Sequence, residues 1–302
     1  MQEGSRRAII AAFFANLGIA ISKLVGFVIT GSASLLAEAV HSLADTGNQG
    51  LLMLGGRRAT KAPSRSHPFG FSRERYFWAF VVALVLFTLG GAFAIFEGIE
   101  KLLNPHELES IWVAIGLLVA AVVMESFSFR TAIRESNPLR GRDKWWQFIH
   151  QTRSPELPVV LLEDFGALIG LAIALCGVIL AKVTGNPRWD AAGSLAIGIL
   201  LCTIAAVLAT EMKSLLIGES ATADVEEEIS ARLAGAPRVR SVIHLRTQHL
   251  GPDDLLVVAK MEFDPSLSVG ELAEVIDEAE RQLRETVPQA RLVFLEPDVR
   301  RD

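Results

Sequence analysis

The amino-acid sequence predicts an α-helical membrane protein, with six transmembrane helices followed by a compact α+β domain. The first observation is composition: 51% of the residues are hydrophobic and the mean hydropathy is +0.38, so the chain is more apolar than an average soluble domain. The second is clustering, because runs such as Phe77–Phe96 approach the roughly 20 residues that a spanning helix needs. The third is asymmetry, because charged residues collect between the runs and after Lys213.

Six apolar runs have this length, and we assign one helix to each. The N-terminal run could be taken for a signal peptide, but no small-residue cleavage site stands out and the run continues to Ile29, so we expect a retained first span. The runs predict a transmembrane domain at residues 1–216 and a second domain at residues 217–302. The six predicted spans are Ala8–Thr30, Ala33–Gly55, Tyr76–Ile99, Ile111–Arg134, Leu157–Val183 and Trp189–Leu216.

Lysine and arginine predict the orientation of these spans. Basic residues gather before the first span, between the second and third, and between the fourth and fifth, whereas the other three connections hold few. Since basic loops stay in the cytoplasm, we expect both termini there, or in the equivalent compartment of an organelle. The sequence therefore predicts a multi-pass integral membrane protein, which we expect in a cell inner membrane.

Net charge and cysteine content exclude other classes of protein. The net charge of -5 comes mostly from the acidic C-terminal part and does not suggest a nucleic-acid partner. Cys176 and Cys202 both lie inside apolar runs, where we expect packed thiols, and two cysteines exclude a disulfide scaffold.

After Leu216 the pattern changes to that of a small mixed domain. Residues 221–235 predict a helix that begins with acidic residues and ends at a glycine. Two alternating segments joined by the turn Gly251–Asp254 predict a hairpin. A second helix and a third strand complete the order helix, strand, strand, helix, strand. In the second strand, one face is expected to collect Val257, Ala259, Met261 and Phe263.

The connection between the fourth and fifth spans contains the segment "RGRDKWWQFIHQTRSPELP", which mixes basic residues with Trp145 and Trp146. Such a segment fits a short helix that lies in the membrane interface. It fits equally a solvated loop that two tryptophans anchor, and the sequence leaves both open.

The second predicted span contains polar residues that its apolar surroundings do not explain. On a helix, Glu38, His41, Asp45 and Asn48 lie at i, i+3, i+7 and i+10 and form one stripe. His41 and Asp45 are one turn apart, so their side chains are neighbours. A charged residue at mid-bilayer costs roughly 2.5–3.5 kcal/mol on insertion scales. The stripe should therefore face a partner or a water-filled cavity.

The fifth predicted span supplies a partner, because Glu163 and Asp164 lie inside its apolar run. With a rise of about 1.5 Å per residue, Asp45 and Asp164 both lie roughly 10–16 Å from the cytoplasmic edge. One imidazole and two carboxylates that meet at this depth suit a divalent cation. The alternative is that these groups only join helices by hydrogen bonds. The matched depth favours a metal site formed by His41, Asp45 and Asp164.

Other polar residues and glycines of the spans carry weaker signals. Glu38 lies nearer the outer face and suits an entrance or packing residue, and Glu125 in the fourth span is ambiguous. Asp190, at the start of the sixth span, suits a helix cap. Gly166 and Gly170 have the spacing that permits close helix packing.

Four short motifs follow one another along the chain: His41-x-x-x-Asp45 in the second span, "HPFGFSRER" after it, "DAAGSLAIG" at the start of the sixth span and "HLRT" in the C-terminal domain. In this combination the chain resembles the cation diffusion facilitator family of metal–proton antiporters over nearly its whole length. The segments "HSLADTGNQGLL" and "PVVLLED" are most similar to the divergent branch related to the mitochondrial zinc exporter.

The resemblance implies a Y-shaped homodimer whose cytoplasmic domain has a ferredoxin-like fold. It also implies that His41, Asp45 and Asp164 bind the metal. The family usually has a fourth ligand one turn before the position of Asp164, where this chain has Val160. The candidates for that place are Glu163, Asn48 and water.

Two further metal sites of the family are incomplete in this chain. The loop site retains His67 but has Phe71 at the second histidine position. At the ligand positions of the cytoplasmic domain, this chain has Ile243, Lys260 and Leu295. We therefore expect one essential metal site per protomer, and we expect His244 and His249 to be surface or structural residues.

The residues and the resemblance together predict a secondary transporter, not an enzyme, that exports a divalent metal cation from the cytoplasm in exchange for protons. Zinc is the expected substrate, since it favours four-coordinate sites of nitrogen, oxygen or sulfur. A site with one imidazole fewer leaves manganese, iron and cobalt as alternatives. A cation channel, and a membrane-embedded metalloenzyme with Glu163 as general base, are the rival classes. No cofactor is expected, and the expected partners are the metal ion, protons, the lipid bilayer and a second copy of the chain.

Overall fold

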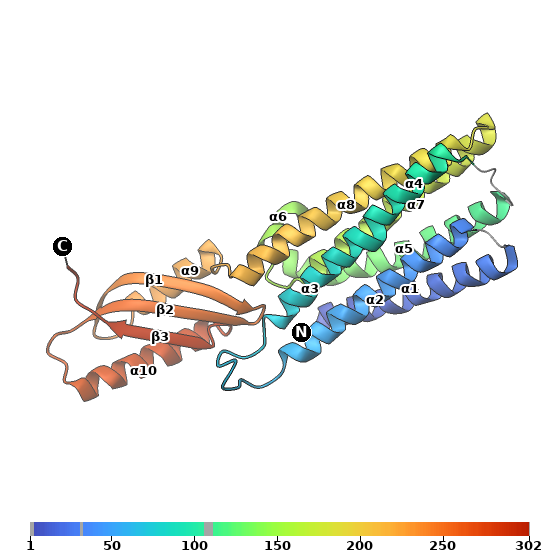
Figure 1. Ribbon diagram of the computed structural model, residues 1–302. Coiled ribbons are helices and arrows are strands. Elements are labelled where there is room, and N and C mark those ends of the chain that lie inside the picture. Colours follow the sequence, from blue (N-terminus) through green and yellow to red (C-terminus); the bar gives the residue numbers. More distant parts are fainter. Residues whose placement is uncertain (1–2, 31–32, 106–110, 302) are drawn as a thin grey trace. The chain divides into compact units, whose positions relative to one another are not determined.

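The computed structural model describes residues 3–30, 33–105 and 111–301, and the chain divides into two compact units. The first unit contains Met1–Arg58 and Glu74–Lys213, and the second contains Ala59–Arg73 and Ser214–Asp302. In the described residues, long helices form the first unit, whereas the second holds a three-stranded sheet with helices packed against it (Figure 1).

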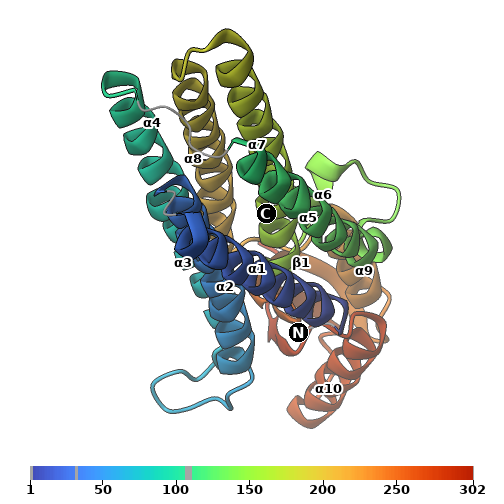
Figure 2. The same cartoon turned by 90° about the vertical axis from the view of Figure 1, so that its right-hand side faces the viewer.

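The first unit is a bundle of helices that run alongside one another (Figure 2). Among the described residues, four helical stretches are long and apolar enough to cross a membrane, and they correspond to the predicted third to sixth spans. The helices at the predicted first and second spans have 28 and 27 residues. The elements are α1 (Glu3–Thr30), α2 (Ala33–Ala59), α3 (Glu74–Val85), η1 (Leu86–Ala92), α4 (Phe93–Leu103), α5 (Ile111–Arg140), α6 (Trp145–Gln151), α7 (Glu156–Thr184) and α8 (Arg188–Ile217).

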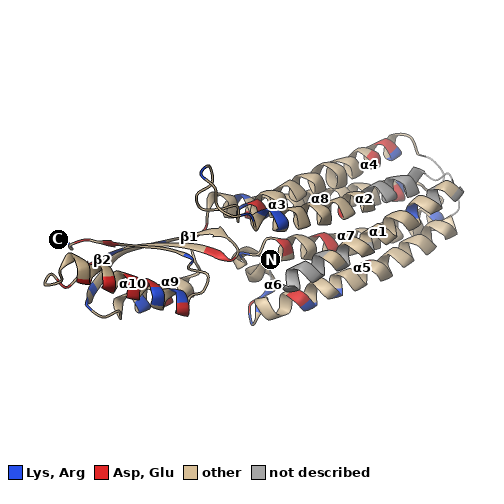
Figure 3. Cartoon of the chain, turned by 90° about the horizontal axis from the view of Figure 1, so that it is seen from below, with Lys and Arg blue, Asp and Glu red and all other residues tan. Residues whose placement is uncertain are grey.

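Apolar side chains cover much of the outer surface of this unit. Phe96, Phe127 and Val183 are 68%, 67% and 78% exposed, and Figure 3 shows the helices to be largely free of charge along their length. In water such a surface would favour association, whereas lipid solvates it. The expectation of packed thiols is wrong for Cys176, which is exposed. Cys202 is half-buried, and a Cβ added at Gly91 would lie 2.5 Å from its Sγ.

The third predicted span is not a uniform α-helix. Between α3 and α4 the backbone forms the π-helical segment η1, which contains Gly90 and Gly91. Thr88 donates a hydrogen bond from its hydroxyl to the carbonyl of Leu84 at 2.9 Å. A π-turn adds one residue to the helical repeat, so the residues on either side of it face a different direction than a regular helix would give. The sequence pattern did not predict this segment.

Glycines allow α8 to pack closely against the third span and against α7. A Cβ added at Gly198 would lie 2.8 Å from the backbone nitrogen of Ile95 and 3.0 Å from the carbonyl oxygen of Gly91. At Gly166 an added Cβ would lie 2.5 Å from the end of the Ile204 side chain. The close packing expected from the glycine spacing in the fifth span is therefore present.

An ion pair joins α4 and α8 at one end of the unit. Lys101 in the last turn of α4 lies 3.0 Å from Glu97 and 3.4 Å from Asp190, which is in the first turn of α8. The sequence left the role of Asp190 ambiguous. Its negative charge lies at the N-terminus of α8, where the helix dipole favours an acidic residue, and it pairs with Lys101.

A second ion pair joins the starts of α3 and α7. Arg75 donates two hydrogen bonds to Glu156, from Nε to Oε1 at 2.5 Å and from Nη2 to Oε2 at 2.9 Å. Both side chains are almost fully buried, with 3% and 1% exposure. A buried pair with this two-bond geometry satisfies much of the hydrogen-bonding capacity of both charges. It therefore fixes the start of α7, the helix that carries Glu163 and Asp164.

The segment between the fourth and fifth spans forms the short helix α6 rather than an irregular loop. Phe148 and Ile149 are buried, whereas Trp145 and Trp146 are exposed. Nδ1 of His150 lies 2.6 Å from Oε1 of Glu211 in α8. The helix is therefore attached to the unit by one apolar face and one polar contact.

The second unit has the predicted order of elements. The strand order is β1-β2-β3, with β1 and β2 antiparallel and β2 and β3 parallel. Both helices contribute to one core with the sheet, through residues such as Leu233 and Leu283. In β2 the buried positions alternate and include Val257, Ala259, Met261 and Phe263, as the sequence predicted. The elements are α9 (Ala223–Ala234), β1 (Val239–Gly251), β2 (Asp254–Phe263), α10 (Val269–Thr286) and β3 (Leu292–Pro297).

The loop after α2 belongs to the second unit. The hydroxyl of Ser72 donates a hydrogen bond to Oδ2 of Asp254, at the turn between β1 and β2. Oδ1 of the same aspartate accepts a bond from Arg291 at 2.8 Å. A Cβ on Gly251 would overlap Ser72. The hairpin turn therefore uses a glycine and an aspartate to hold this loop.

Replacement of Gly198 by alanine should destabilise the helical unit. The added methyl group meets backbone atoms of Ile95 and Gly91, which cannot rotate away, and overpacking of this kind costs about 1–3 kcal/mol. The matched control is Gly116→Ala, where an added Cβ meets nothing within 4 Å. Thermal unfolding of the purified protein in detergent, followed by size-exclusion chromatography, measures the difference. Equal melting temperatures for the two variants would contradict the close packing of α8.

Replacement of Glu156 by glutamine should remove a carboxylate charge that pairs with the buried guanidinium of Arg75. Loss of one partner from a buried ion pair typically costs about 3–5 kcal/mol. Glu74→Gln is the control, since that carboxylate is half-buried, lies 3.9 Å from the exposed Arg58, and a glutamine oxygen can still accept the bond from Trp78 Nε1; ion pairs with a solvent-exposed partner contribute about 1 kcal/mol or less. The same thermal assay should show a much larger loss for Glu156→Gln. Similar losses would mean that the pair does not fix α7.

Candidate metal site

Helix α2 presents a row of buried polar side chains to the interior of the helical unit. Ser42, Asp45, Asn48 and Gln49 are all at most 6% exposed. Their spacing places them on one face of the helix, and Asp45 and Asn48 are two of the four residues of the predicted stripe. His41 is part of α2, but its side chain, like that of Glu38, lies outside the described residues.

Helix α7 carries two consecutive acidic residues that point to different neighbours. Glu163 and Asp164 are 5% and 1% exposed. Consecutive residues of a helix lie about 100° apart around its axis, so one helix can offer a carboxylate to two partners. Glu163 is directed to α2 and Asp164 to α5, as their hydrogen bonds show.

Both oxygens of Glu163 accept hydrogen bonds from amide groups of α2. Nδ2 of Asn48 donates to Oε1 at 2.9 Å, and Nε2 of Gln49 donates to Oε2 at 2.7 Å. The carbonyl oxygens of these two amides are buried and have no hydrogen-bond partner among the described residues. The structure therefore joins Glu163 and Asn48, the two side chains that the sequence offered for a fourth ligand. Gln49 was not predicted to take part.

Asp164 is hydrogen-bonded to α5. Its Oδ2 accepts a bond from the hydroxyl of Ser128 at 2.8 Å. Asp45 is an electrostatic neighbour of both Asp164 and Glu163. Among the described residues, Glu163 accepts hydrogen bonds from two amides of α2, and the meeting of Asp45 with Asp164 around one ion stays a prediction.

Two ionisable residues near this group were not assigned by the sequence analysis. Glu125 of α5 is 6% exposed and is an electrostatic neighbour of Asp164 and Asp45. Lys23 of α1 is 7% exposed, and its Nζ donates a hydrogen bond to the hydroxyl of Ser42 at 2.9 Å. A general signal existed for both, since an ionisable residue inside a spanning segment is by default a candidate functional residue.

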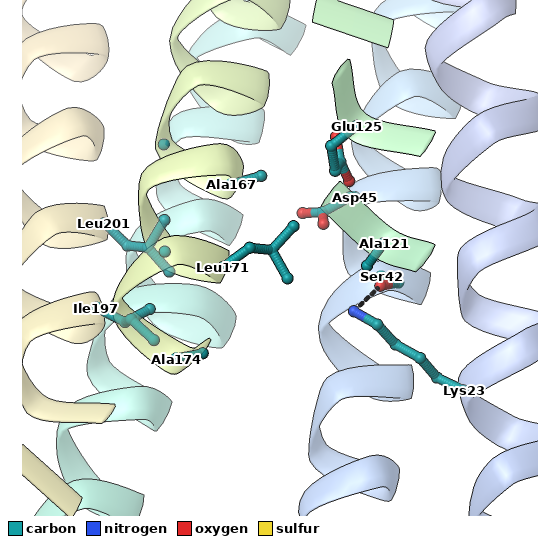
Figure 4. Close-up of a pocket in the computed structure, with 12 residues that line it drawn as sticks. Lys23, Ser42, Asp45, Ala121, Glu125, Ala167, Leu171, Ala174, Ile197 and Leu201 are labelled. Atoms are coloured by element: carbon teal, nitrogen blue, oxygen red, sulfur yellow. Dashed lines mark hydrogen bonds between the residues drawn. The ribbon is translucent and has the colours of Figure 1, made fainter. Parts of the chain in front are cut away.

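A cavity of about 40 Å³ lies beside these groups. Figure 4 shows Asp45 and Glu125 on one side of it, with Leu171 and Leu201 across from them. A space of this size can hold a water molecule or a small ion. Its walls are formed by Lys23, Ser42, Asp45, Ala121, Glu125, Gly166, Ala167, Gly170, Leu171, Ala174, Ile197 and Leu201.

The described residues contain no group of three histidine, cysteine or acidic side chains placed to hold a metal ion together. The predicted set includes His41, whose side chain is not among them. For the rest, the arrangement is a cluster of buried carboxylates with amide, hydroxyl and ammonium groups around it. Oxygen ligands of this kind suit a divalent cation, and their burial among apolar helices makes the uncompensated charges costly.

The other histidine positions of the chain do not form a second metal site in the described residues. The ring of His67 is exposed and lies 4.5 Å from the ring of Phe71. His249 is buried, and its backbone nitrogen donates to the carbonyl of Glu219 at 2.8 Å. Lys260 pairs with Asp298 at 3.2 Å and with Glu296 at 3.3 Å. The hydrogen bonds to these two acids raise the pKa of Lys260, so an ammonium group stands where a ligand would be needed.

Comparison with known proteins identifies the family. Residues 9–217 match the cation efflux transmembrane domain, and residues 221–298 match the cytoplasmic domain of cation efflux proteins. The chain belongs to the cation efflux family. This family is the cation diffusion facilitator family that the sequence motifs indicated, and the match covers both units of the structure.

Several curated members of the cation efflux family are similar to this chain. The "Proton-coupled zinc antiporter SLC30A9, mitochondrial" of Xenopus laevis is 34% identical over 87% of this chain and 47% of its own length. The magnetosome protein MamB of Paramagnetospirillum magneticum is 25% identical over 94% of this chain and 90% of its own. The zinc transporter ZitB of Pectobacterium atrosepticum is 24% identical over 85% and 76%. The chain thus spans about half the length of the mitochondrial relatives that it matches, and the resemblance to that branch is confirmed.

Replacement of Gln49 by leucine should destabilise the protein, because Glu163 would lose one of its two amide donors while staying buried. Leaving such a group unsatisfied costs about 1–3 kcal/mol, or more for a charge. The double variant Gln49→Leu/Glu163→Leu removes both partners and should recover part of this loss. Thermal unfolding in detergent measures both. A single variant as stable as the wild type would show that this hydrogen bond does not hold α2 against α7.

Proposed function

We propose that this chain is a secondary transporter that exports a divalent metal cation, zinc, from the cytoplasm in exchange for protons. The observation that carries the proposal is the cluster of buried carboxylates on α2 and α7 inside a helical unit that matches the cation efflux transmembrane domain. The similar proteins named for proton-coupled zinc antiport and zinc transport support zinc as the substrate. The chain acts as a transporter rather than an enzyme.

The proposed architecture has six spanning helices at residues 1–216 and a cytoplasmic domain at residues 217–302. Four of the spans rest on long apolar helices, and α1 and α2 supply the other two. The order helix, strand, strand, helix, strand supports a ferredoxin-like fold for the domain, and the match to the cytoplasmic domain of this family supports a homodimer. The distribution of lysine and arginine supports cytoplasmic termini, and the proposed location is a cell inner membrane.

His41, Asp45 and Asp164 are the proposed metal ligands. Glu163, Asn48 or water completes the coordination, and a hydrogen bond joins the two side chains. To bind the ion, Glu163 would have to give up a hydrogen bond from the amide of Asn48 or Gln49. The Ser128 hydroxyl orients the Asp164 carboxylate, as partners behind a ligand commonly do.

Coupling to protons follows from competition for the same groups. A metal ion binds ionised carboxylates and neutral imidazole, so protons and metal exclude one another. An imidazole has an ordinary pKa near 6.5, which suits exchange near neutral pH. Alternating access around this midplane site would let the metal enter from the cytoplasm and protons displace it on the far side.

A carboxylate-rich site also favours a second substrate class. With one imidazole and three acidic side chains in the cluster, the donors are harder than in a histidine-rich zinc site. Manganese, iron and cobalt accept such donors. Transport of each ion, measured alone and in competition with zinc, separates these substrates.

Replacement of Asp45 or Asp164 by asparagine should abolish most transport. Proteoliposomes with an imposed pH gradient should accumulate zinc against its gradient, and each variant should lower the initial rate by at least the 10–100-fold that loss of an outer-shell partner typically costs. Asp143→Asn, at an exposed loop position, is the control. Wild-type rates in the Asp45 or Asp164 variant would end the ligand assignment. Zinc flux that ignores the pH gradient and runs only downhill would indicate a channel.

A further inference from the structure

Glu125 occupies a position that packing alone does not explain. In α5 the buried residues Ala121, Glu125, Ser128, Ala132 and Ser136 follow one another at three- or four-residue spacing and form one stripe. The stripe faces the interior, and its other members are small. A carboxylate among them is costly to bury unless it has a partner.

The carboxylate of Glu125 is nine-tenths buried and is directed into a cavity. It is 6% exposed, and no hydrogen bond to it comes from the described residues. Figure 4 shows it beside Asp45, and the hydrogen bond drawn among the residues around the cavity joins Lys23 and Ser42. Glu125 is thus a buried acid that faces about 40 Å³ of space, which a second acid also borders.

The cavity lies on one side of Asp164, one of the proposed ligands. Its wall residues from α7 run from Gly166 to Ala174, all after Asp164 in the chain and so further from the start of α7. On α5, Glu125 comes one turn before Ser128, which binds Asp164. Because α5 and α7 run in opposite directions in the proposed topology, both helices place the cavity on the same, non-cytoplasmic side of Asp164.

Lys23 supplies positive charge at this cavity. It borders the space, and it is an electrostatic neighbour of Glu125. Its bond partner Ser42 precedes Asp45 by one turn of α2. The ammonium group thus offsets part of the repulsion between the two carboxylates when no metal lies between them.

We propose that Asp45 and Glu125 form a second binding position for the transported divalent cation, in the cavity between α2, α5 and α7, through which the ion leaves the proposed ligand set toward the non-cytoplasmic side. This inference rests on the proposed transport function and deepens it. Asp45 belongs to both positions, so the ion changes its other ligands from the α7 acid to the α5 acid without losing Asp45. The cavity has room for one small ion. In each position the positive charge of the ion compensates two buried carboxylates, Asp45 with Asp164 in the first and Asp45 with Glu125 in the second.

The test replaces Glu125 in ways that separate a ligand from a structural residue. Glu125→Gln keeps the shape and removes the charge, and Glu125→Cys introduces a soft ligand, which favours cadmium over manganese. Glu135→Gln, on the same helix and only half-buried, is the control. Each full-length protein is reconstituted into proteoliposomes, and the initial rates of Zn²⁺, Cd²⁺ and Mn²⁺ transport are measured under one pH gradient.

We expect Glu125→Gln to lower zinc transport by about tenfold or more, with Glu135→Gln unchanged. We expect Glu125→Cys to raise the ratio of Cd²⁺ to Mn²⁺ transport above that of the wild type, which a residue needed only for packing would not do. If wild-type protein moves zinc and Glu125→Gln moves it equally well, the second position is wrong and the transport function stands. If Glu125→Gln does not fold, the Cys variant decides: an unchanged ion ratio overturns the inference. If the wild type moves no metal, the proposed function itself fails.

Discussion

The structure depends on the burial of several carboxylates inside an apolar helix bundle. Asp45, Glu125, Glu163 and Asp164 are each at most 6% exposed, and charges in such surroundings are stable only with partners. Part of the compensation is built in, because amides of α2 bind Glu163 and Ser128 binds Asp164. These bonds leave an excess of negative charge, and a divalent cation with protons as its competitors accounts for that excess in the proposed transporter.

The rest of the helical unit fixes α7, which carries two of these acids. The start of α7 is held by the ion pair between Arg75 and Glu156, and its middle packs against α8 at Gly166. Gly185 ends the helix with a left-handed backbone, φ 65°. The third span differs from α7 because it contains the π-helical segment η1. Gly91 of this segment packs closely against α8. A bundle in which one helix is fixed and a neighbour contains an irregular turn suits small relative movements of helices around a central site.

Sequence reasoning predicted much of the fold because its signals are local. The length of the apolar runs predicted the helices, and the alternation of apolar residues predicted the buried face of β2. The form of α6 and of the segment η1 depends on tertiary contacts, so the sequence did not decide it.

In the site, the acid pair of α7 was found from charge within an apolar run. Lys23 carries the same signal but was passed over, and Glu125 was left unassigned because one sequence does not show which face of α5 is buried. The amide contacts of Gln49 could not be predicted, since they depend on the rotation of α2 about its axis.

The central claim is that the acids of α2 and α7 hold the transported ion. Crystals of the protein grown with zinc and measured at the zinc absorption edge test it most directly, because the anomalous signal identifies the position of the metal by its element. The account predicts a peak in the helical unit within about 2.0–2.2 Å of carboxylate oxygens of Asp45 and Asp164. A peak on the helical unit that touches neither residue, from protein that transports zinc, would contradict it.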